Sequence, residues 1–164
     1  MPKTELPWFD DFANDLLSDE KLNNALAFAS FLYDNGLMAL KTSKYFWSVK
    51  YKGTRICTIS LRENSWWIRF FGRTDGSHEL LDRSEAYMTD EHKNFILDRI
   101  REPQCRNCRS YIEKTIFGKT FEKICWCTPI MLFNPSEEIL EYAEEITLIA
   151  RKTADVIAAE KTAT

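Results

Sequence analysis

Two pairs of cysteines have the spacing of metal ligands. Cys105 and Cys108 stand in the run CRNC, and Cys125 and Cys127 stand in the run CWC. Structural zinc takes four ligands and prefers thiolate, and a tight C-x2-C turn aims two sulfurs at one ion. A C-x-C pair on an extended strand likewise places both sulfurs on one face. The spacing therefore predicts a structural zinc ion bound by Cys105, Cys108, Cys125 and Cys127.

Two other interpretations of these cysteines stay open. Cysteine often serves as a small buried hydrophobic residue. Alternatively, Cys105 and Cys108 could form a redox dithiol, with His78 as a helper. A redox pair needs a helix N-terminus to lower its thiol pKa, whereas this pair follows an expected helix and Pro103. Cys57 alternates with other side chains on an expected strand, which indicates packing.

The chain between the two cysteine pairs has the pattern of a hairpin. Gly118 and Lys119 form a turn signal, and apolar residues flank it on both sides. The C-x2-C turn, the hairpin and the second cysteine pair together predict a zinc-ribbon-like subregion over residues 103–133.

The rest of the chain predicts a single α+β domain over residues 1–164, since this length is typical of one domain. A helix is expected after Ser18 or Asp19, ending at Asn35-Gly36. Residues 44–72 alternate like three strands joined by tight turns, which predicts an antiparallel meander. Residues 72–88 are expected to form a loop.

Two further helices complete the expected fold. Thr89 is expected to cap a helix over residues 90–100. The run NPSEE predicts the start of a long C-terminal helix that packs back on the sheet, with Asn134 as its cap and Pro135 in the first turn. Helices are needed because the meander carries bulky aromatic side chains that must be covered.

Those aromatic side chains also form a candidate ligand-binding surface of Trp47, Tyr51, Trp66 and Trp67. Trp66 and Trp67 are adjacent, so on a regular strand they face opposite ways. One of them must therefore leave the main core and be covered by another element or by a partner, such as a protein or a small apolar ligand.

Charge argues against nucleic acid as the partner, because the net charge is −3. Basic residues nevertheless gather over residues 93–123, where eight Lys or Arg face four acids. This basic ribbon includes Arg101, Arg106, Arg109 and Lys119, and it keeps nucleic-acid binding as an alternative. The opposing interpretation is that these charges are solvated or pair with the acidic last helix.

A cytoplasmic protein without a membrane segment is expected. Acidic residues among the first apolar ones are the opposite of a signal peptide, and no run approaches the ~18 apolar residues of a spanning helix.

A family resemblance runs from about Trp47 to Lys152. It depends on the T-I-F-G-K-x-F turn, the cysteines on either side of it, and the N-P-x-x-E helix start. In these features the chain resembles a family of small uncharacterised proteins from anaerobic Gram-positive bacteria. The resemblance implies membership of that family and no particular activity.

The function expected from these patterns is a noncatalytic binding or regulatory module with a structural zinc site. The five glycines are isolated, so a glycine-rich phosphate loop is absent, and the chain has no G-x-S-x-G motif. The alternatives are a thiol-redox protein or small enzyme using Cys105 and Cys108, and a nucleic-acid-associated protein using the basic ribbon.

Overall fold

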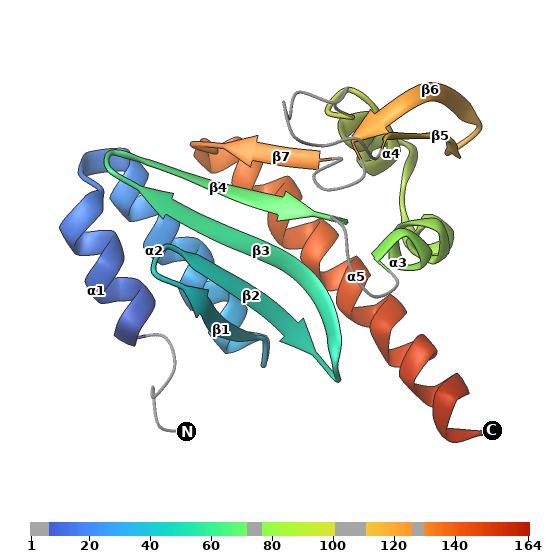
Figure 1. Ribbon diagram of the computed structural model, residues 1–164, viewed down its shortest axis with the longest axis horizontal. Coiled ribbons are helices and arrows are strands. Elements are labelled where there is room, and N and C mark those ends of the chain that lie inside the picture. The colour runs from blue at the N-terminus through green and yellow to red at the C-terminus, as the bar shows by residue number, and fades with distance from the viewer. Residues whose placement is uncertain (1–6, 72–76, 101–110, 126–129) are drawn as a thin grey trace.

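The computed structural model describes residues 7–71, 77–100, 111–125 and 130–164 (Figure 1). These residues form an α+β fold of helices, a five-stranded antiparallel sheet and a separate β-hairpin. The helices are α1 (Pro7–Leu16), α2 (Asp19–Asp34), α3 (Ser77–Ser84), α4 (Asp90–Leu97) and α5 (Glu137–Thr162), with a short 3₁₀ helix, η1 (Glu85–Tyr87). The sheet contains β1 (Met38–Ser43), β2 (Phe46–Tyr51), β3 (Thr54–Arg62), β4 (Ser65–Phe70) and β7 (Ile130–Phe133), and the hairpin contains β5 (Tyr111–Ile116) and β6 (Lys119–Cys125).

The sheet has the strand order β1-β2-β3-β4-β7, and each neighbouring pair is antiparallel. The predicted meander is confirmed as its centre, strands β2 to β4. The prediction of three strands was incomplete, because β1 and β7 extend the sheet on either side. A central register row runs through Val49, Cys57, Phe70 and Ile130, which all point into the core.

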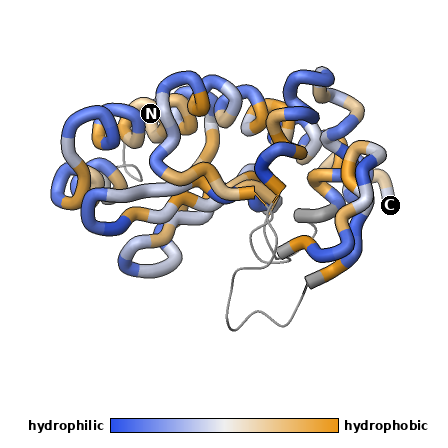
Figure 2. Tube along the Cα trace, turned by 90° about the horizontal axis from the view of Figure 1, so that it is seen from above, coloured by the Kyte–Doolittle hydropathy of each residue, from blue (hydrophilic) through white to orange (hydrophobic). Residues whose placement is uncertain are grey.

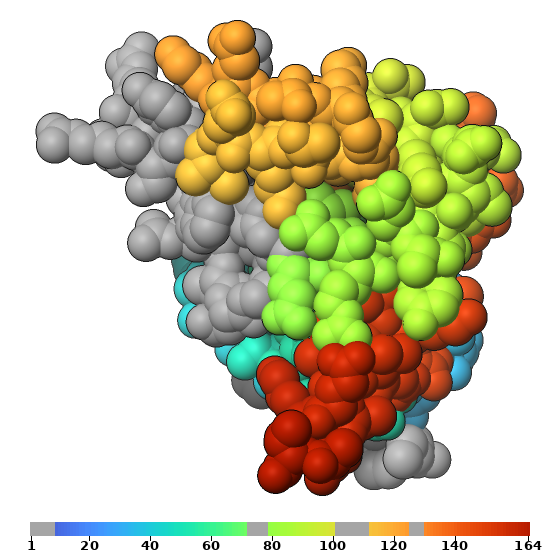
Figure 3. All heavy atoms as spheres, turned by 90° about the vertical axis from the view of Figure 1, so that its right-hand side faces the viewer, coloured from blue at the N-terminus to red at the C-terminus, as the bar shows by residue number. Residues whose placement is uncertain are grey.

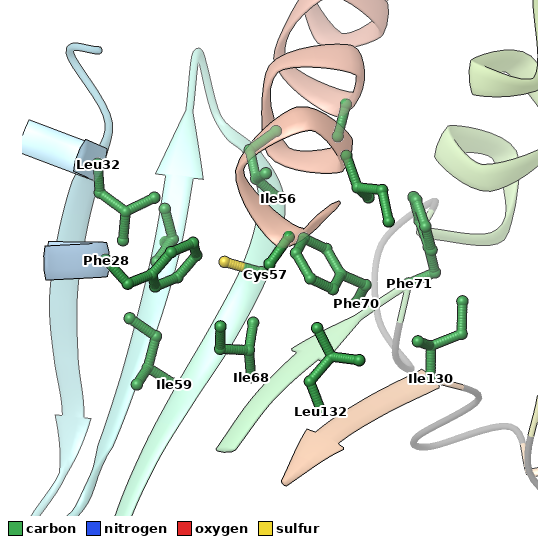
Figure 4. Packing of buried hydrophobic residues seen from close by; sticks show 14 of the residues in the cluster. Phe28, Leu32, Ile56, Cys57, Ile59, Ile68, Phe70, Phe71, Ile130 and Leu132 are labelled. Atoms are coloured by element: carbon green, nitrogen blue, oxygen red, sulfur yellow. The ribbon is translucent and has the colours of Figure 1, made fainter. Parts of the chain in front are cut away.

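Helices α2 and α5 lie behind the strands in Figure 1, and Figure 2 shows the strands and helices as separate layers. Between the layers lies the core, in which Cys57 of the sheet lies between Phe28 of α2 and Phe70 of β4 (Figure 4). Helix α5 contributes a buried stripe that includes Leu140, Ile146 and Ile157. Each large apolar side chain buried in this way stabilises the fold by about 1.5–3 kcal/mol relative to exposure. The expected packing of the C-terminal helix on the sheet is confirmed.

The start of α5 differs from the prediction. Asn134 is not the helix cap, because Ser136 caps α5 by accepting a hydrogen bond from the Ile139 N–H at 3.4 Å. Asn134 has a positive φ of 42° and pairs with Trp66 instead. Its Oδ1 accepts from the Trp66 N–H at 2.9 Å, and its own N–H donates to the Trp66 carbonyl at 2.8 Å. Asn134 therefore ends β7 and turns the chain toward the helix.

The region expected to be a loop contains α3 and η1 instead, so the loop prediction was wrong for residues 77–87. The next helix, α4, begins after Thr89 as predicted, and the hairpin β5–β6 turns at Phe117-Gly118. Lys114 of β5 forms an ion pair with Asp82 of α3 at 2.9 Å. Figure 3 shows the hairpin, α3 and α4 as one continuous surface above the end of α5.

Candidate functional site

The side chains that point away from α2 and α5 form the second face of the sheet, which we call the outer face. Strand register defines its two central rows. One row contains Phe46, Ser60, Trp67 and Phe133, and the next contains Leu40, Ser48, Thr58, Arg69 and Met131. Met38, Lys50, Arg55 and Arg62 complete the face. The outer face alternates with the core residues along the strands, as the two-residue period of a strand requires. The exception is the bulge in β3, where Ile56 and Cys57 are both buried and Arg55 and Thr58 share the outer face.

Charge is separated between the two layers of the molecule. The five described strands of the sheet contain five Lys or Arg residues and no Asp or Glu. Helices α1, α2 and α5 contain thirteen acidic and four basic residues. Of the strand cations, Lys41 faces α1, with its Nζ 4.3 Å from the ring centroid of Phe12. The other four, Lys50, Arg55, Arg62 and Arg69, belong to the outer face.

Guanidinium groups and aromatic rings alternate across this face. The Arg62 guanidinium lies 5.4 Å from the ring centroid of Tyr45 and 5.5 Å from that of Phe46. The Arg69 guanidinium lies 5.4 Å from the Phe46 centroid and 5.5 Å from the Trp67 centroid. Cation–π contacts at this range hold both partners in place. Arg62 and Arg69 are therefore held beside the rings.

Large apolar side chains are also exposed here. Four large apolar residues are exposed in the described part of the chain. Three of them, Met38 at 49%, Leu40 at 38% and Phe133 at 59%, lie on the outer face, and Leu148 lies on α5. The Phe133 ring stacks on Trp67, with centroids 6.2 Å apart. Grouped exposed apolar side chains are typical of a binding surface.

The four residues of the candidate ligand surface lie in different places. Trp47 and Trp66 are core residues, 1% and 0% exposed, so they line no surface. Tyr51 is partly buried, and its hydroxyl donates to Oδ1 of Asp155 at 3.0 Å. Trp67 faces the opposite way from Trp66 and lies on the outer face. Binding by any of the four remains a prediction.

The predicted zinc site lies outside the described residues. Cys105, Cys108 and Cys127 fall in segments that the structure does not describe, and of Cys125 only the backbone, at the end of β6, is described. No group of three or more His, Cys, Asp or Glu that could hold a metal occurs in the ranges that are described. Cys57 is 2% exposed, and burial raises the pKa of its thiol.

His92 has a structural role at the start of α4. Its Nδ1 accepts a hydrogen bond from the Thr89 N–H at 3.2 Å, and its Nε2 lies 2.6 Å from Oε2 of Glu145 on α5. Nδ1 therefore completes the cap of α4, and Nε2 docks α4 against α5. The side chain of His78, the proposed helper of the redox pair, lies outside the described residues.

Several described members of the basic ribbon contact acidic or aromatic side chains of this protein. Lys93 pairs with Glu85 at 3.5 Å, and Lys114 pairs with Asp82. The Lys119 Nζ lies 5.2 Å from the ring centroid of Phe121. Arg101, Arg106 and Arg109 fall outside the described residues.

A groove of about 800 Å³ lies between α2 and α5. Five carboxylates and two amides line it, among them Glu137, Glu141 and Glu144. Burial, and then the neighbouring Glu141 charge, raise the pKa of Glu144. The groove lacks a cation or a nucleophile among its lining residues, so the outer face remains the better candidate.

In the described ranges, no helix combines the length and apolarity that crossing a lipid bilayer demands. Comparison with known proteins finds no matching family model, no matching curated protein and no matching solved structure. The cations, aromatic rings and exposed apolar side chains of the outer face are therefore the best indication of function.

Proposed function

We propose that the protein is a noncatalytic binding module that holds an anionic partner against the outer face of its sheet. The observation that carries the proposal is the separation of charge, with basic strands in front of acidic helices. A sheet is a rigid support, so cations displayed on it are already positioned for a partner.

The net charge of −3 does not oppose this function. At physiological ionic strength, exposed charges more than about 8 Å apart are largely screened from each other. A ligand approaching the outer face therefore responds mainly to nearby cations such as Lys50 and Arg62, which are both exposed. The acidic helices lie on the other side and would repel the same ligand, which fixes the face on which it binds.

Heparin tests this proposal, because it is a flexible polyanion without aromatic groups. We expect salt-dependent binding, with the slope of log K against log salt concentration falling by about one for each contacting cation removed. Arg62→Glu and Lys50→Glu should each weaken binding. Lys161→Glu makes the same charge change at the exposed end of α5 and should have little effect.

Two outcomes would contradict the proposal. One is an absence of heparin binding by the folded wild-type protein at low salt. The other is equal weakening by Arg62→Glu and Lys161→Glu, since this would mean that total charge matters and the outer face does not.

A further inference from the structure

We infer that the partner of the outer face is a single-stranded nucleic acid whose bases stack across the sheet. The inference rests on the proposed function and names its ligand class. The residues that would receive the bases form a row, which we call the stacking row: Tyr45, Arg62, Phe46, Arg69, Trp67 and Phe133.

The stacking row presents flat groups in an alternating order. Arg62 lies between Tyr45 and Phe46, and Arg69 lies between Phe46 and Trp67, each within 5.5 Å of both ring centroids. Unpaired bases stack on aromatic rings and on guanidinium planes, and each stack is sequence-tolerant because every base has a flat face. The exposed Arg62 guanidinium also supplies positive charge for the phosphates.

The length of the row suits a short stretch of bases. Phe46, Trp67 and Phe133 belong to β2, β4 and β7, with β3 between the first two. Neighbouring strands are separated by about 4.7–4.9 Å, so the row spans about 14 Å across the sheet. Sheets that bind RNA use aromatic residues at such positions to stack two or three bases.

Two buried polar atoms beneath the row have no hydrogen-bond partner among the residues that the structure describes. The Ser60 side chain is 0% exposed and lies between Phe46 and Trp67 in the register. Neither its hydroxyl nor Nε1 of Trp67 has a hydrogen-bond partner within the described part of the chain. A buried donor without an acceptor is unfavourable and calls for an explanation. Both atoms are buried, so a base edge could bond to them only after the groups that cover them had moved.

Two other anionic partners fit the row less well. An acidic peptide would neutralise the cations but would leave the exposed part of the Phe133 ring, which is 59% exposed, uncovered. A nucleic-acid duplex keeps its bases stacked inside, where the face of a sheet cannot reach them. The combination of rings, guanidinium planes and positive charge therefore favours a single strand.

Fluorescence anisotropy with labelled oligo(dT) and oligo(U) of about 20 nucleotides tests the inference, because single-strand binding sites span roughly 4–16 nucleotides per domain. Two substitutions remove flat groups without changing charge. Phe133→Leu keeps apolar bulk, and Arg62→Lys keeps the cation. Phe133→Leu should weaken oligonucleotide binding by about tenfold and leave heparin binding unchanged, whereas Arg62→Lys should weaken oligonucleotide binding more than it weakens heparin binding. Phe133→Tyr keeps the ring and should bind as the wild type does.

The outcomes separate this inference from the proposed function. If a duplex of equal length binds as tightly as the single strand, or if Phe133→Leu has no effect, stacking is wrong while heparin binding still supports the module. Tighter binding of poly-glutamate than of either oligonucleotide would also overturn the inference, in favour of an acidic peptide. Failure to bind both heparin and oligonucleotides would overturn inference and proposed function together.

Discussion

Trp66 and Trp67 are neighbours in the chain and lie on opposite faces of the sheet. Trp66 is 0% exposed and packs near Phe28 of α2, with ring centroids 6.4 Å apart. Trp67 stacks on Phe133 and lies beside Arg69 on the outer face. One strand therefore supplies both a core residue and a surface residue of the same type.

Alanine substitutions at these two positions should have unequal effects on stability. Trp66→Ala opens a cavity in the core, and we expect a loss of about 3–5 kcal/mol in the free energy of unfolding. Trp67→Ala removes a stacking contact and a cation–π contact, and we expect a loss of about 1–2 kcal/mol. Urea unfolding of the two variants measures the difference. Equal losses would show that Trp67 also belongs to the core.

The central part of the fold could be predicted because its signals are local. Strands β2 to β4 are rich in aromatic and β-branched residues and are joined by short turns, and Thr89 is a standard helix cap. Strand β1 lacks this signal, since only Ala39 of its six residues is buried. Strand β7 has four residues, and its pairing with β4 joins distant segments. Long-range pairing of this kind leaves little trace in the sequence.

The outer face was missed for a different reason. Counting charges along the chain mixes the two faces of each strand, so the basic residues of the sheet were not recognised as a group. Arg55 and Arg62 are seven residues apart on β3, an odd spacing that predicts opposite faces of a regular strand. The β-bulge between them brings both to the outer face, and a bulge is not visible in the sequence pattern. The contribution of Phe133 could not be found in this way, because it depends on where β7 joins the sheet.

Asn134 should be tested as a strand-ending residue. Its positive φ of 42° is unfavourable for most residues and acceptable for glycine. Asparagine adopts a positive φ more readily than alanine does. Asn134→Ala therefore strains the backbone and also removes the hydrogen bond that Asn134 Oδ1 accepts from the Trp66 N–H. We expect it to destabilise the fold by about 1–3 kcal/mol in urea unfolding. Asn134→Gly keeps the backbone conformation and should lose less, whereas the reverse order would show that φ is unimportant here.

The zinc prediction can be checked by metal analysis of the purified protein. We expect one zinc per chain, because Cys105, Cys108, Cys125 and Cys127 provide four thiolates. Cys105→Ser should reduce the zinc content and make the remaining thiols reactive. If the wild-type protein contains no zinc and its dithiol cycles reversibly at cytosolic potentials, the redox alternative is favoured instead.

Thiol counting should distinguish Cys57 from the other four cysteines. Only the thiolate reacts, and burial both shields the Cys57 thiol and raises its pKa. In native protein treated with a chelator, we expect the wild type and Cys57→Ala to show the same number of reactive thiols at neutral pH. After unfolding, the wild type should show one more. If the native wild type showed one more rapidly reacting thiol than native Cys57→Ala, the sheet would have to open at Cys57.

The ion pair between Lys52 and Asp155 should give stability a defined pH dependence. The Lys52 Nζ lies 2.6 Å from Oδ1 of Asp155, joining the turn after β2 to α5. The hydrogen bond to Asp155 raises the pKa of Lys52, and the hydrogen bond from Lys52 lowers the pKa of Asp155. The carboxylate's contribution is complete above its unfolded pKa of about 3.9 and is lost as the pH falls through the lower folded value. The lysine's contribution is complete below its unfolded pKa of about 10.4 and is lost as the pH rises through the higher folded value.

A double-mutant cycle with Lys52→Gln and Asp155→Asn isolates this pair. Both side chains are about half exposed, at 54% and 42%, so we expect a small coupling that added salt reduces. The coupling should be present near pH 7 and should be lost as the pH falls through the pKa of Asp155 in the folded chain, which the Lys52 hydrogen bond lowers below the unfolded value of about 3.9. Urea unfolding of the four proteins at several pH values measures it. A coupling that persisted unchanged at acid pH would show that the contact between Lys52 and Asp155 does not depend on the carboxylate charge.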